Sequence, residues 1–155
     1  MLTHQARRMV ALLVLVDVAA TALAWVAAFV LRFYVLDAAL PVTKGIPDFS
    51  RYALLLPLIA LLWPIVLYFH GLYQIKRGRS RIDELFATLF SVLIGSALTL
   101  GATLYLRVYH FYQPDVAPLW EYSQAVFGLF IVLDVLALNG ARWALRSWQE
   151  RRWRA

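Results

Sequence analysis

Four long apolar stretches dominate the hydrophobic pattern of the chain, and shorter polar or basic segments separate them. The apolar stretches cover residues 9–31, 52–70, 85–106 and 122–141. Because about 20 apolar residues in a helix cross a hydrocarbon core about 30 Å thick, each stretch is long enough to span a bilayer. The pattern therefore predicts an all-α integral membrane protein, a four-helix bundle whose helices run up-down-up-down.

The composition agrees with this assignment. Of the 155 residues, 63% are hydrophobic, whereas a soluble domain is about 45–50% apolar. The first apolar run is longer than the core of a signal peptide, which spans about 7–15 residues, so we expect it to stay as the first membrane helix. The chain has no cysteine, which excludes disulfides and thiolate metal sites.

The basic residues are distributed unevenly over the connections. Eleven of the fifteen lie before the first stretch, between the second and third, or after the fourth, and four lie in the other two connections. By the positive-inside rule this bias places both termini in the cytoplasm, and an even number of spans also puts them on one side. The net charge of +6 is spread along segments that flank the membrane, with no groove-reading motif, so nucleic acid is not an expected partner.

Two of the stretches contain residues that affect helix packing. Pro57 and Pro64 lie in the second stretch, where each removes a backbone donor and is expected to kink the helix. Gly95 and Gly101 lie in the third, each four residues after another small residue. Such spacing permits close contact between membrane helices.

Asp17 and Asp134 are the carboxylates that lie well inside the spans, on the first and last stretches. From the helix rise, both sit about 12–14 Å from the same membrane boundary. Because charge at this depth needs a partner, we expect the first and last helices to be neighbours and the two carboxylates to share a polar pocket. Thr21, Asn139 or an arginine could be the partner. A structural hydrogen-bonded pair is the favoured interpretation, and a proton relay or a lipid-phosphate site is the alternative.

The turn between the second and third stretches is short and basic. Gly71 is expected to end one helix in a left-handed cap, and Ser80 to begin the next, with acidic Asp83 and Glu84 in its first turn. Four basic residues of the turn are candidates for contact with lipid phosphate or headgroups: Lys76, Arg77, Arg79 and Arg81. A role in setting the topology alone is the simpler interpretation.

The sequence lacks a recognisable catalytic or metal site. No two of its three histidines have the i, i+4 spacing of helical metal ligands. It also has no glycine-rich phosphate loop, and no nucleophile stands close to a base. The chain itself therefore predicts no catalytic residue, no metal ligand and no cofactor.

Several motifs together resemble one family. They are Asp17 in the first stretch, Leu31-Arg32-Phe33 at its end, the turn His70-Gly71-Leu72-Tyr73, the segment Arg77-Gly78-Arg79-Ser80-Arg81-Ile82-Asp83-Glu84-Leu85, and Glu121-Tyr122-Ser123 before the fourth stretch. This set resembles the N-terminal membrane region of bacterial polyprenyl-phosphate sugar-1-phosphate transferases, the large monotopic phosphoglycosyl transferases. The resemblance covers nearly the whole chain.

The resemblance implies that the membrane domain and the catalytic domain of such a protein have separate roles. Residues 1–141 would be a four-span, non-catalytic anchoring and assembly domain in the bacterial inner membrane, and residues 142–155 a basic linker helix leading to cytoplasmic domains outside this sequence. In that family a separate catalytic domain, which is expected to use Mg²⁺, transfers a sugar phosphate to undecaprenyl phosphate through an aspartate-glutamate dyad. Asp83-Glu84 lacks the surrounding sequence of that dyad.

The resemblance also sets the candidate partners and alternatives. Candidate partners are membrane lipid, polyprenyl phosphate, a second copy of the chain and the C-terminal cytoplasmic domains. The glycine-leucine-tyrosine turn with the basic residues after it also looks like the membrane region of nucleotide-sugar epimerases and dehydratases. A standalone four-helix flippase for lipid-linked sugars, or a small transporter, is a further alternative.

Overall fold

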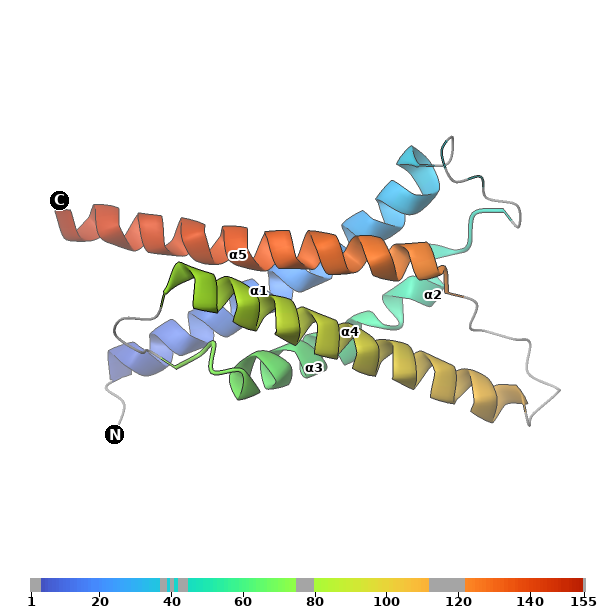
Figure 1. Ribbon diagram of the computed structural model, residues 1–155, viewed down its shortest axis with the longest axis horizontal. Helices are drawn as coiled ribbons and strands as arrows, with labels where there is room; N and C mark the ends of the chain where they lie inside the picture. The colour runs from blue at the N-terminus through green and yellow to red at the C-terminus, as the bar shows by residue number, and fades with distance from the viewer. Residues whose placement is uncertain are drawn as a thin grey trace.

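The structure, a computed structural model, describes residues 4–36, 39, 41, 45–74, 80–111 and 122–154. All the regular secondary structure in these residues is helical (Figure 1). The elements are α1 (His4–Val30), η1 (Leu31–Val35), α2 (Phe49–Ala53), α3 (Leu56–Phe69), α4 (Arg81–Phe111) and α5 (Gln124–Arg154). The all-α prediction is therefore confirmed.

Four segments of this structure are long and apolar enough to cross a membrane. They are Arg7–Val35, Phe49–Phe69, Arg81–Tyr105 and Gln124–Leu145. Each overlaps one of the stretches expected from the hydrophobic pattern, so the prediction of four membrane-spanning segments is confirmed by length and composition.

The boundaries of these segments differ from the expected ones in two informative places. The first does not end at Leu31 but continues as the π-helix η1, where the Leu36 amide donates to the Leu31 carbonyl over 2.8 Å. The second is interrupted at Leu54 and Leu55, so that α2 and α3 together make one span. Pro57 lies in the first turn of α3 and has no N–H to continue the α2 hydrogen-bond pattern, which explains the break.

The helices pack as a bundle in which α1 and α5 make the most extensive contact (Figure 1). Helix α1 also packs against α3, and α4 packs against both α3 and α5. The first and last helices are therefore neighbours, as the positions of Asp17 and Asp134 suggested.

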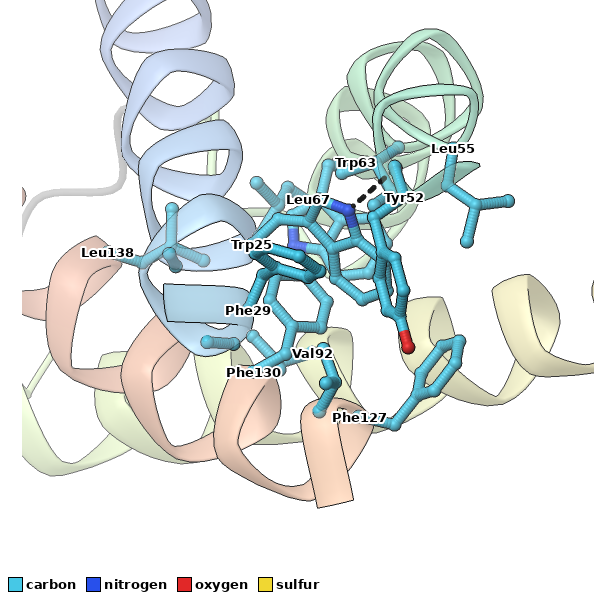
Figure 2. Close-up of a cluster of buried hydrophobic side chains, with 14 of the residues drawn as sticks. Trp25, Phe29, Tyr52, Leu55, Trp63, Leu67, Val92, Phe127, Phe130 and Leu138 are labelled. Carbon is cyan, nitrogen blue, oxygen red and sulfur yellow. Dashed lines mark hydrogen bonds between the residues drawn. The ribbon is translucent and has the colours of Figure 1, made fainter. Parts of the chain in front are cut away.

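An aromatic cluster fills the interior where α1, α2, α3 and α5 meet (Figure 2). The Trp25 ring lies 5.0 Å from the Phe130 ring and 6.0 Å from the Tyr52 ring, measured between centroids, and the Trp63 ring lies 5.3 Å from that of Phe130. Trp25 Nε1 donates a 2.9 Å hydrogen bond to the Tyr52 carbonyl, beside the break between α2 and α3. Because lipid is as apolar as these side chains, close packing and satisfied N–H groups, rather than removal from water, hold this cluster together.

Gly95 permits the close approach of α3 to α4. A β-carbon at this position would lie 3.1 Å from the ring of Trp63, which is tighter than ordinary contact. At Gly101, by contrast, an added β-carbon would meet no atom within 4 Å. Of the two glycines singled out in the sequence, Gly95 is therefore the one that serves packing within this chain.

Tyrosines fasten the start of α5 to α2. The Tyr122 hydroxyl donates to the Arg51 carbonyl over 3.0 Å, and the Ser123 amide donates to the Tyr52 hydroxyl over 3.0 Å. The second bond satisfies a backbone donor just before the first turn of α5, where helical partners are lacking. Burial, together with the neighbouring Tyr52, raises the pKa of Tyr122 to about 12.

Candidate functional site

A buried ion pair joins the first and last helices. Arg142 Nη2 on α5 lies 2.5 Å from Asp17 Oδ2 on α1, and these two side chains are 5% and 0% exposed. An arginine was among the expected partners of Asp17, and the structure identifies it as Arg142. The sequence had counted Arg142 with the basic residues outside the membrane, whereas its guanidinium turns back into the bundle.

Arg142 makes further contacts that bring in two more segments. Its Nη1 lies 3.5 Å from Glu84 Oε1 on α4 and donates over 3.4 Å to the Leu72 carbonyl, in the turn that follows α3. Its guanidinium carbon also lies 5.8 Å from the centre of the Tyr73 ring. One guanidinium therefore connects α1, α4, α5 and the turn after α3.

The turn after α3 is shaped to present the Leu72 carbonyl. Gly71 has a φ of +69°, and the amides of Gly71 and Leu72 donate to the carbonyls of Tyr68 and Leu67 over 2.9 and 3.1 Å. This is a Schellman cap with glycine in its left-handed position, so the cap predicted at Gly71 is confirmed. Burial, followed by the nearby charge of Asp17, raises the pKa of Tyr73.

Asp134 has a different partner. Trp63 Nε1 on α3 donates a 2.6 Å hydrogen bond to Asp134 Oδ2, and the Asp134 side chain is fully buried. Thr21 Oγ1 and Asp134 Oδ1 are both buried, and neither makes a hydrogen bond within the described residues. Asn139, another expected partner, instead donates to the Val135 carbonyl of its own helix.

The two carboxyls thus belong to successive levels of one polar column inside the bundle. Asp17 and Thr21 are one helical turn apart on α1, and Asp134 and Arg142 are about two turns apart on α5. Asp17 pairs with Arg142, and Asp134 pairs with Trp63. Every described contact of these carboxyls is internal, so the column can hold helices together and set their register.

The predicted basic cluster falls largely outside the described residues. Lys76, Arg77 and Arg79 lie outside those residues. Arg81 is described: it is the first residue of α4, and its side chain is exposed. Ser80 caps this helix as expected, since its hydroxyl accepts a 3.2 Å hydrogen bond from the Ile82 amide.

Residues 81–84 form the first turn of α4. Asp83 and Glu84 occupy the first turn of α4, where acidic residues interact favourably with the helix dipole. Glu84 is turned toward Arg142. Within the described ranges no three histidine or acidic side chains are placed to hold a metal ion.

Sequence reasoning missed the roles of Trp63 and Tyr73. A tryptophan or tyrosine in an apolar stretch is usual, and nothing in its local sequence shows that it faces a carboxylate. The spacing of Asp134 and Arg142 did carry a signal, because residues eight apart on a helix share a face.

The chain matches no protein-family model, and no curated protein or solved structure matches it.

Proposed function

We propose that this chain is a non-catalytic membrane-anchoring and assembly domain of an undecaprenyl-phosphate sugar-1-phosphate transferase in the bacterial inner membrane. The family and the reaction rest on the sequence motifs described above. In this proposal the four spans run up-down-up-down with both termini in the cytoplasm. The basic bias of the connections supports that orientation, as does the position of the start of α1 and the end of α5 on the same side of the bundle (Figure 1).

The observation that carries the anchoring role is the internal use of Arg142. Its guanidinium contacts Asp17, Glu84 and the Leu72 carbonyl, which belong to three other segments of the same chain. Ionisable groups that carry ions or protons across a membrane usually line a pathway or a water-filled cavity. Here the buried charges of Arg142 and Asp17 hold helices of the same chain together, as a rigid anchor requires.

The packing of the bundle favours anchoring over the transporter alternative. Trp25, Trp63 and Phe130 are at most 1% exposed and lie in the middle of the bundle (Figure 2). A lipid-linked sugar would need a polar route past these rings.

Helix α5 supports a connection to a further domain. It continues without interruption from its membrane span, which ends at Leu145, to Arg154. The nine residues beyond the span extend the helix by about 14 Å. A continuous helix would fix the position of whatever follows it relative to the membrane.

Membranes that contain the full chain test this proposal. We expect no transfer of sugar phosphate from nucleotide sugars to added undecaprenyl phosphate, and no flipping of a fluorescent lipid-linked sugar analogue in reconstituted vesicles. A fluorescent protein fused after Ala155 should stay in the membrane through an alkaline carbonate wash. Transfer or flipping by the purified chain, or release of the fusion by the wash, would contradict the anchoring role.

The coding sequence after codon 155 separates the transferase from the epimerase alternative. A later membrane-associated helix with an aspartate-glutamate pair would support the transferase. A strand followed by Gly-x-Gly-x-x-Gly, with a later Tyr-x-x-x-Lys, would instead support the membrane domain of an epimerase or dehydratase.

A further inference from the structure

A cavity of about 440 Å³ lies between the start of α4 and the last part of the membrane span of α5. The span of α4 begins at Arg81, and that of α5 ends at Leu145. The cavity therefore lies at the ends of two candidate membrane spans, where we place the membrane interface. Its polar lining comes from Arg81, Glu84, Asn139, Arg142 and Ser147.

The cationic part of this lining is suited to a phosphate. Arg81 is exposed, and its guanidinium has no ion pair within the part of the chain that the structure describes. Arg142 also lines the cavity, but it is only 5% exposed and its guanidinium is held by Asp17 and Glu84. The first turn of α4 adds backbone N–H groups and the positive end of a 31-residue helix.

One carboxylate opposes this charge. Glu84 lines the same cavity, and its Oε1 lies 3.5 Å from Arg142 Nη1. Because Arg142 Nη2 also pairs with Asp17, these two carboxylates offset the single charge of Arg142. Arg81 and the positive end of α4 are therefore the cationic groups that a ligand in the cavity can contact. Ser147 and Asn139 are uncharged and can still interact with a headgroup.

Apolar side chains border the polar groups. Ile82 and Leu85 on α4 and Trp143 on α5 line the cavity and are 64, 45 and 66% exposed. A tryptophan at this level is typical of the membrane interface. Apolar and polar groups in one cavity at headgroup depth match a molecule with a phosphate joined to acyl chains.

We propose that this cavity binds the headgroup phosphate of an anionic membrane phospholipid, with Arg81 as its main cationic contact. The phosphate lies against the first turn of α4, beside the Arg81 guanidinium. The acyl chains lie along Ile82, Leu85 and Trp143. This site is independent of the proposed enzymatic context of the chain.

The test measures binding of three probes to the purified full chain in detergent by native mass spectrometry. They are dihexanoyl phosphatidylglycerol, dihexanoyl phosphatidylcholine and inorganic phosphate. We expect one molecule of phosphatidylglycerol to bind at least about fivefold more tightly than phosphatidylcholine. Arg81→Gln should weaken phosphatidylglycerol binding about fivefold, the effect of one basic residue near an anionic surface.

Two further variants sharpen the test. Arg8→Gln removes an arginine of α1 that is also exposed and lies outside the cavity, so it should leave binding unchanged. Ser147→Phe fills the cavity without changing the charge and should abolish binding. Because Arg81 and Arg8 are both exposed, their variants should keep the helical content and the thermal midpoint of the parent chain.

Three results would overturn the proposal. The first is equal affinity for the anionic and zwitterionic lipids, and the second is equal binding by the Arg81→Gln and Arg8→Gln variants. The third is binding of inorganic phosphate as tight as that of phosphatidylglycerol, which would identify a free-anion site instead of a lipid site.

Discussion

Arg142→Met should strongly destabilise the bundle, because it removes the guanidinium that serves four segments at once. Asp17 would lose its 2.5 Å ion pair while remaining fully buried. The Leu72 carbonyl would lose a donor, and Glu84 would lose its nearby cation. Methionine keeps most of the length and apolar character of the side chain, so the change tests the charge more than the volume.

The expected magnitude follows from the burial of the pair. A hydrogen bond to a charged group contributes about 1.5–3 kcal/mol, and breaking a buried ion pair by removing one partner costs about 3–5 kcal/mol. Asp17→Asn should cost less than Arg142→Met, since Arg142 would keep Glu84 and the Leu72 carbonyl as partners. Removing both charges in Asp17→Leu/Arg142→Met should recover most of the loss, because two apolar side chains need no partner.

The assay is equilibrium unfolding of the purified chain in mixed micelles by SDS titration, followed by helical circular dichroism. The parent, Asp17→Leu, Arg142→Met and the double variant form a double-mutant cycle that isolates the coupling between Asp17 and Arg142. A cost below about 1 kcal/mol for Arg142→Met, or a double variant less stable than either single one, would refute the reasoning.

Three further predictions use the same unfolding assay. Gly95→Ala should cost about 1–3 kcal/mol, because its methyl group would press on the Trp63 ring, whereas Gly101→Ala should be neutral or slightly stabilising; equal effects would exclude the packing argument. Trp63→Phe should cost about 1–3 kcal/mol through the lost donor to Asp134, and this cost should shrink when Asp134→Leu is already present; an unchanged cost would show that the hydrogen bond contributes nothing. Because the pKa of Tyr122 is raised to about 12, the folded state holds that proton more tightly than the unfolded state, so its contribution is fully present below pH 10 and lost between pH 10 and 12. The difference in unfolding free energy between the parent and Tyr122→Phe should follow that pH range, and a difference that does not vary with pH would contradict it.

The hydrophobic pattern predicted the helices well because each span must bury its own backbone hydrogen bonds in lipid. It placed the four apolar segments and the Gly71 and Ser80 caps, which depend on local residues. It did not place the break at Leu54 and Leu55. Proline marked that helix as irregular, but the position of the break depends on how the Trp25 N–H and the aromatic cluster use the Tyr52 carbonyl.

The candidate site was predicted less completely, for a physical reason. The depth of a residue along a helix follows from its spacing in the sequence, and this spacing placed Asp17 and Asp134 at similar depth. The prediction that the helices carrying them are neighbours is confirmed. Which partner each carboxyl takes depends on the rotation of the helices about their axes and on side chains from a third helix. Trp63 reaches Asp134 from α3, and Arg142 reaches Asp17 by turning back along α5, and neither direction is encoded in local spacing.

The central claim is that these four helices span the membrane and that the turn at residue 80 and both termini face the cytoplasm. Because the chain has no cysteine, single substitutions can be labelled in intact bacteria with a membrane-impermeant maleimide. Asp48 and Ser80 are both exposed, and they lie at opposite ends of the proposed topology. We predict that Asp48→Cys is labelled in intact cells with a permeable outer membrane and that Ser80→Cys is labelled only after the inner membrane is broken. Labelling of Ser80→Cys in intact cells, or protection of Asp48→Cys, would contradict the account.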